Sequence, residues 1–117
     1  MTPAEVRQSY RENMDAVGET IVIRRYTGTG VGRVPADTNV RARVTGYEER
    51  ELVGTIQQGD RKLIVLVEDL INAGFAVPVT PNDKVVLRGT MISIVTVDDS
   101  TRRIQGELIA YEIQARG

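Results

Sequence analysis

The stretch DKVVLRGTMISIVTVDD, residues 83–99, holds two runs rich in valine and isoleucine on either side of a glycine. Both residue types favour strands, and Gly89–Thr90 suits a two-residue hairpin turn with glycine first. The segment GELIAYEIQARG, residues 106–117, continues with apolar residues at every second position, which are Ile109, Tyr111 and Ile113. The pattern predicts an antiparallel meander whose final strand has one buried face. The connection DDSTRRIQG is expected to be a longer polar hairpin loop.

Three more strands are predicted upstream of this meander, at residues 19–27, 38–46 and 61–67. In the second of them, valine and alanine alternate with arginine and threonine, as in a half-buried strand. Residues 68–74 are expected to form one or two helical turns that end at a glycine. Two prolines, Pro78 and Pro81, exclude a regular helix from the next segment.

Residues 2–17 have the start and stop signals of a helix. Thr2 can cap it, Pro3 suits the first helical position, and Gly18 follows the end. One narrow apolar stripe follows the helical period and consists of Val6, Tyr10, Met14 and Val17. The stripe is expected to dock on the sheet of the same chain, and the alternative is packing on a neighbouring subunit.

These elements predict a mainly β protein, a small barrel or sandwich of about six antiparallel strands with one N-terminal helix. The 117 residues suit a single domain, with the helix in 1–18 and the β-barrel in 19–117. Two long loops, 28–38 and 47–60, are expected between the early strands.

Composition restricts the chemistry. The chain has no cysteine and no histidine, which excludes disulfides, thiolate zinc sites and Ser–His–Asp or Cys–His catalysis. The net charge of −1 does not favour wrapping nucleic acid. No apolar run is long enough for a membrane span, and no signal peptide is visible. We expect a soluble cytoplasmic protein that is not an enzyme and has no cofactor or metal.

The glycine-rich stretch YTGTGVGRVPADT, residues 26–38, does not fit a phosphate-binding loop. Its glycines are spaced G-T-G-V-G, one residue short of the dinucleotide fingerprint, and a proline and a strand follow instead of a helix. A pliable strand-to-strand connection explains it better. The neighbouring carboxylates at Glu48–Glu49, Glu68–Asp69 and Asp98–Asp99 do not indicate an acid–base pair, because adjacent strand residues point to opposite faces.

Arginines form one local basic excess around the first two strands. Its members are Arg24, Arg25, Arg33, Arg41 and Arg43. This excess is either a solvated face balanced by nearby glutamates or a docking surface for an acidic protein or DNA. Because nucleic-acid platforms interleave aromatic residues with the basic ones and only Tyr26 is available, a protein partner is favoured.

The order of these features resembles the neck proteins of tailed bacteriophages, the head-closure (stopper) and head–tail joining proteins, and their relatives in gene transfer agents. The similarity rests on Asp83, Val85 and Gly89, on a strand that ends in Asp98, and on a closing strand with Tyr111 and Arg116–Gly117. It covers most of the chain as a pattern of strands and turns.

The resemblance implies a structural virion protein, assembled in the cytoplasm of the bacterial host. Such a protein forms a homo-oligomeric ring under the portal and adaptor, closes the DNA channel after genome packaging and docks a tail terminator or tail tube. It contacts double-stranded DNA in passing and uses neither a membrane nor a small-molecule substrate.

In this resemblance the segment 47–60 corresponds to the gating loop. Its expected channel residues are Glu48, Glu49, Arg50, Glu51, Leu52, Val53 and Ile56. The glutamates would repel phosphates, and the apolar residues would meet their copies around the ring axis. The arginines named above, together with Arg116, are the expected docking residues.

Two alternatives stay open. One is a tail terminator, adaptor or minor tail protein of the same assembly. The other, from a different class, is a small oligonucleotide- or oligosaccharide-binding barrel.

Overall fold

The computed structural model describes residues 2–28 and 30–117, except for the side chain of Glu49. The elements in chain order are α1 (Pro3–Val17), β1 (Glu19–Thr27), a 3-10 turn (Gly30–Gly32), β2 (Val34–Gly46), a 3-10 turn (Glu49–Glu51), β3 (Arg61–Leu66), α2 (Val67–Asn72), β4 (Lys84–Leu87), β5 (Thr90–Asp98), β6 (Arg103–Ile104), β7 (Glu107–Leu108) and β8 (Ala110–Arg116).

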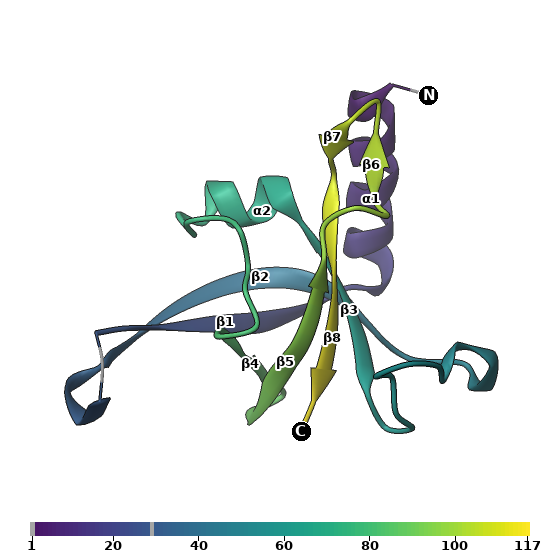
Figure 1. The fold of residues 1–117 in the computed structure, drawn as a ribbon. Helices are drawn as coiled ribbons and strands as arrows, with labels where there is room; N and C mark the ends of the chain where they lie inside the picture. Colours follow the sequence, from purple (N-terminus) through teal and green to yellow (C-terminus); the bar gives the residue numbers. More distant parts are fainter. Residues whose placement is uncertain (1, 29) are drawn as a thin grey trace.

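Six strands close into an antiparallel barrel in the order β1-β2-β3-β8-β5-β4 (Figure 1). The predicted mainly β fold, with one N-terminal helix and a short helix after the third strand, is confirmed, and the barrel is the correct choice over a sandwich. Every second residue of each strand points inward, and these side chains are almost all aliphatic. Among the fully buried ones are Ile23, Leu63, Val65, Val85 and Ile113.

Helix α1 packs on the outside of the barrel of its own chain. Thr2 caps the helix as predicted, and Glu5 completes a capping box with it. Met14 is buried against Leu66 and Ala110, which point outward from β3 and β8. Val17, expected in the same apolar stripe, is half exposed.

The prediction of one buried face for the final strand was wrong. Tyr111 and Ile113 point into the barrel, as expected, but Ile109 precedes the strand and packs with Met14 outside the barrel, and Ala110 and Gln114 on the outer face are buried as well. Their burial has two causes, because α1 covers one end of this outer face and the loop 47–60 covers the other.

The turn between β4 and β5 lies one residue earlier than predicted. Leu87 pairs with Thr90, so the turn residues are Arg88 and Gly89. Both have positive φ, 50° and 83°, as a type I′ turn requires. The expected polar connection 98–106 contains most of a second small hairpin, in which β6 pairs with β7.

The expected loop 28–38 is shorter than predicted, because β2 already begins at Val34. Thr27 pairs with Val34, and the ladder between β1 and β2 continues without interruption to the barrel. Pro35 is tolerated within β2 because the other edge of β2 pairs with β3 only from Arg43 onward. Residues 25–28 and 30–36 therefore form a two-stranded projection, called the arm below.

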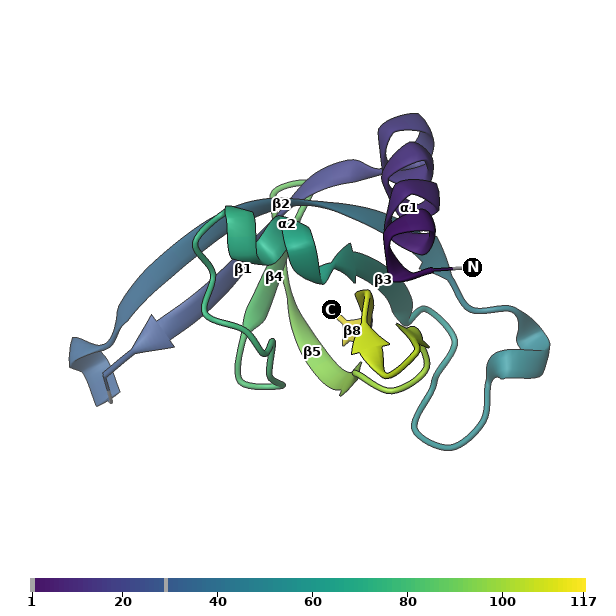
Figure 2. The same cartoon turned by 90° about the horizontal axis from the view of Figure 1, so that it is seen from above.

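The arm and the segment 47–60 project on opposite sides of the barrel in both views (Figures 1 and 2). The segment 47–60 connects β2 to β3 and contains one 3-10 turn; it is called the channel loop below after the role that the resemblance implies for it. The two projections make the molecule elongated, with principal extents of 48 × 35 × 26 Å.

Candidate functional site

The base of the channel loop is fastened to the barrel by one buried carboxylate. Asp60 is 2% exposed at its side chain and accepts hydrogen bonds from Arg116 Nε (2.8 Å) and Nη2 (2.9 Å). It also accepts from Gln114 Nε2 (2.9 Å) and from the backbone N–H of Gln57 (2.9 Å). The Arg116 hydrogen bonds outweigh burial and hold the pKa of Asp60 far below its usual range.

The same two β8 side chains also hold the middle of the channel loop. Arg116 Nη2 donates to the carbonyl oxygen of Thr55 at 2.7 Å, and Gln114 Nε2 donates to that oxygen at 3.2 Å. Since β8 belongs to the barrel wall, residues 55–60 are fixed to that wall by two side chains that lie 54 to 61 residues away in the sequence. The channel loop is therefore held against the barrel through residues 55–60.

The predicted channel residues divide into exposed and anchored ones. Glu48 and Arg50 are exposed and form an ion pair at 2.8 Å. Val53 is two-thirds exposed, whereas Leu52 and Ile56 are half-buried. Glu51 pairs with Lys62 of β3 at 2.8 Å, and this bond lowers the pKa of Glu51. The side chain of Glu49 lies outside the described residues. The exposed side chains described at the tip of the loop are therefore Glu48, Arg50 and Val53.

The six arginines predicted as docking residues do not form one patch. They lie on β1, on β2, on β8 and, for Arg33, just before β2. Four of them bond to groups of the same chain: Arg24 to Asp37, Arg25 to Asp83, Arg41 to the end of α1, and Arg116 to Asp60. These bonds reduce the basic excess that the sequence indicates.

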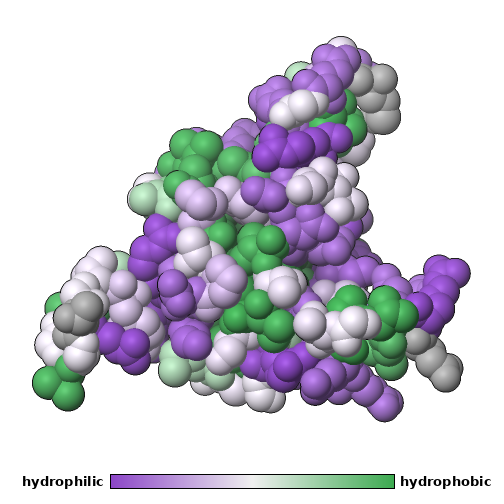
Figure 3. All heavy atoms as spheres, viewed as in Figure 1, coloured by the Kyte–Doolittle hydropathy of each residue, from purple (hydrophilic) through white to green (hydrophobic). Residues whose placement is uncertain are grey.

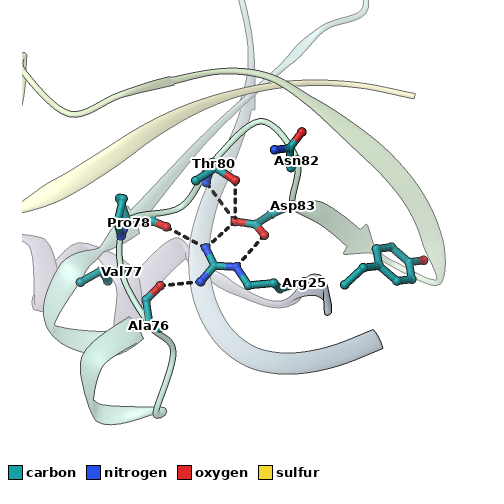
Figure 4. Close-up of a pocket in the computed structure, with 8 residues that line it drawn as sticks. Arg25, Ala76, Val77, Pro78, Thr80, Asn82 and Asp83 are labelled. Atoms are coloured by element: carbon teal, nitrogen blue, oxygen red, sulfur yellow. Dashed lines mark hydrogen bonds and ion pairs between the residues drawn. The ribbon is translucent and has the colours of Figure 1, made fainter. Parts of the chain in front are cut away.

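Arg25 holds the base of the arm (Figure 4). Its guanidinium pairs with Asp83 through Nε and Nη2, both at 2.8 Å, and donates to the carbonyl oxygens of Ala76 (2.6 Å) and Pro78 (2.7 Å). It also lies 4.3 Å from the centre of the Phe75 ring. Beside it is a hollow of about 420 Å³, but all three guanidinium nitrogens already have partners. Arg25 is therefore a structural clamp between β1 and the segment 75–83.

Arg41 stabilises the end of α1. Its Nη2 donates to the carbonyl oxygens of Met14 and Gly18, both at 2.9 Å. The last turn of α1 has no basic residue of its own, so Arg41 supplies the positive charge that the negative end of a helix favours.

Replacing this arginine tests that role. Arg41→Ala is expected to lower the free energy of unfolding by about 1 to 2 kcal/mol, because two helix-end carbonyls lose their charged donor. Arg43→Ala is the matched control, since Arg43 lies on the same outer face of β2 and its side chain makes no hydrogen bond to the described residues. Urea unfolding of both variants measures the difference. Equal losses would contradict the role of Arg41.

Sequence reasoning did not identify the structural role of the two buried aspartates, Asp60 and Asp83. Each lies at the end of a polar connection and accepts the backbone N–H of the third residue before it, Gln57 or Thr80. This turn pattern is visible in the sequence. The arginine partners are not, because they lie 56 and 58 residues away.

Several site types are absent from the described residues. No group of three or more carboxylates in residues 2–28 and 30–117 could hold a metal ion. Within the same ranges, no helix is both long and apolar enough to cross a membrane.

The fold and the site together define a closed six-stranded β-barrel that carries an anchored loop on one side and a two-stranded arm on the other. No protein-family model matches the chain, and no curated protein matches its sequence.

Proposed function

We propose that this chain is a structural subunit of a bacteriophage head–tail connector, of the stopper type. The observation that carries the proposal is the channel loop, which projects from the barrel and is fixed at its base by Asp60, Gln114 and Arg116. A loop that blocks a channel has to withstand the pressure of the packaged genome. Bonds between the loop base and the barrel wall supply that resistance.

The exposed end of the channel loop suits a position near DNA. Glu48 is exposed at the tip and paired with Arg50, so the described tip has no unbalanced positive charge that would hold DNA phosphates against the channel wall. Val53 is exposed beside it and in a ring would face copies of itself around the axis. The lumen would then exist only in the assembly, because repeated head-to-tail contacts create it.

The arginine pairs favour this proposal over the oligonucleotide-binding alternative. A nucleic-acid groove needs arginine and lysine side chains that are available for phosphates, whereas Arg24, Arg25, Arg41 and Arg116 are bonded within the chain. An adaptor, tail terminator or minor tail protein of the same assembly differs from a stopper in its neighbours in the neck. Binding partners therefore distinguish these roles.

Assembly on a portal–adaptor complex tests the proposal. The isolated protein is expected to sediment mainly as a monomer and to form a ring only when portal–adaptor complexes are added. Electron microscopy of the complexes would detect that ring. A tight dimer in sedimentation, without binding to portal–adaptor complexes, would overturn the stopper role.

Binding to single-stranded DNA is the second measurement. We expect no binding that weakens with rising salt, since few cationic groups are available for phosphates. Strong salt-dependent binding would favour the oligonucleotide-binding barrel instead.

A further inference from the structure

The tip of the arm presents apolar side chains that the described part of the chain leaves uncovered. Val31 is fully exposed, and Val34 is 60% exposed. Apolar surface is visible at the end of the projection in Figure 3. Arg33 lies between these two valines, and none of the ion pairs among the described residues includes it. The tip is therefore apolar with one positive charge.

Two contacts connect the strands of the arm although it projects into solvent. Arg24 and Asp37 pair across its root through two bonds, of 2.8 and 3.0 Å. Nearer the tip, the guanidinium of Arg33 lies 4.0 Å from the centre of the Tyr26 ring. An isolated two-stranded hairpin is only marginally stable in water, so this bracing keeps the arm in one shape. A pre-organised element loses less conformational entropy on binding.

A groove of complementary chemistry lies on another face of the same molecule. It has a volume of about 250 Å³ and lies between α1, α2 and β7. Its apolar lining consists of Val67, Ile71 and Leu108, of which Ile71 is 57% exposed. We call it the helix groove.

The rim of the helix groove is acidic. Glu107 is paired with Arg7. Glu68 is more available, because its nearest cation, Arg11, lies 3.9 Å away and makes its short bonds of 2.6 and 3.1 Å to Asp69. The side chain of Glu68 is 46% exposed. The groove thus offers an apolar floor and one carboxylate, and the arm tip offers apolar side chains and one guanidinium.

We propose that the arm tip of one copy binds in the helix groove of the next copy. Val31 would pack on Ile71 and Leu108, while Arg33 would pair with Glu68. Both halves of the contact are present on one chain, so a second copy is the partner that the charges and apolar surfaces specify. Tip and groove are different surfaces, and such a contact repeats around a ring or along a filament.

This inference deepens the proposed function by naming the contact between ring subunits, and it rests on that function only for the choice of a ring over a filament. The contact is small. Interfaces well below about 1,200 Å² are typical of transient association. This agrees with the expectation that the isolated protein is mainly monomeric.

Disulfide trapping tests the contact, because the chain contains no cysteine. Val31→Cys in one copy and Ile71→Cys in another would bring two thiols together in the proposed contact. Val17→Cys, at a residue that is also half exposed, replaces Ile71→Cys in the control mixture. Under mild oxidation the Val31–Ile71 heterodimer is expected to form on the order of tenfold faster than the Val31–Val17 one, since a disulfide needs Cα atoms within about 7 Å.

Charge reversal tests the orientation of the contact. Arg33→Glu in the Val31→Cys chain is expected to abolish the rate advantage, because two carboxylates then face each other, and Glu68→Arg in the partner chain is expected to restore it. Equal rates for the test and control mixtures, or faster formation of the Val31–Val31 homodimer, would overturn the proposal. Circular dichroism melting of each variant verifies that the fold is retained.

Failure of this inference is separable from failure of the proposed function. Trapping requires neither DNA nor a portal, so a positive result stands even if heads assembled with altered channel loops retain their DNA. Absence of trapping, together with loss of DNA from such heads, would overturn the contact and keep the stopper role.

Discussion

Heads filled in the presence of a variant without the channel loop are expected to lose their DNA. In this variant Asn–Gly replaces residues 47–60. Gly46 and Arg61 are paired across β2 and β3, so a two-residue type I′ turn can join the strands there. The barrel is expected to form, while the projection that would block the channel is absent. Nuclease sensitivity of the packaged DNA and electron microscopy of the heads measure the loss.

Two controls make this result interpretable. Val17→Gln changes an exposed apolar residue of α1, far from the loop in the sequence, and is expected to leave DNA retention unchanged. A circular dichroism melt verifies that the shortened chain still folds, because excision also removes Asp60 from Gln114 and Arg116. Normal DNA retention by a folded, ring-forming loop variant would show that the gating role is wrong.

Asp60→Ala is expected to lower the free energy of unfolding by about 2 to 4 kcal/mol, because a buried carboxylate and its hydrogen bonds are lost together. The lower half of this range is favoured, since the Arg116 side chain is 40% exposed and water can solvate it. Asp15→Ala, at an exposed aspartate of α1, is the control and is expected to change stability by less than about 0.5 kcal/mol. Urea unfolding at neutral pH measures both. Equal effects would contradict the anchoring role.

The same aspartate gives the stability a defined pH dependence. The pKa of Asp60 is lowered in the folded protein, so its contribution is fully present above the pKa of an unfolded aspartate, about 4, and is lost as the pH falls below that value. The stability of the natural chain is expected to decline on acidification below about pH 4 more steeply than that of Asp60→Asn. Parallel curves for the two proteins would show that Asp60 does not carry this dependence.

The barrel could be predicted because each of its strands can be recognised from a short stretch of sequence. Alternation of apolar residues identified the strand around Val40, runs of valine, isoleucine and leucine identified those around Leu63 and Ile92, and the Thr2 cap helped to identify the helix. The arm was not predicted because glycines and Pro35 are typical of loops, and only the ladder between β1 and β2 shows that the strands continue. The β4–β5 turn was misplaced because Arg88 adopts a positive φ, which is uncommon for a residue with a side chain.

The candidate site was predicted less completely than the fold. The channel loop was located correctly between the second and third predicted strands, since its length and mixed character distinguish it from a simple turn. The anchor of the loop was not predicted, because Asp60 contacts Arg116 only when β8 is paired with β3. For the same reason, the arginine count overestimated the basic surface. Charge pairs between distant residues follow from topology and cannot be seen in a local pattern.

The position of β8 also determines when the barrel can close during synthesis. β8 is paired with β3 on one side and with β5 on the other, although both neighbours precede it in the chain. Until residues 110–116 have left the ribosome, β3 and β5 have nothing between them and the aliphatic interior stays open to water. Pairings so distant in sequence also slow folding. The nascent chain therefore carries an exposed apolar surface through most of its synthesis, which is the stage at which it depends most on protection from aggregation.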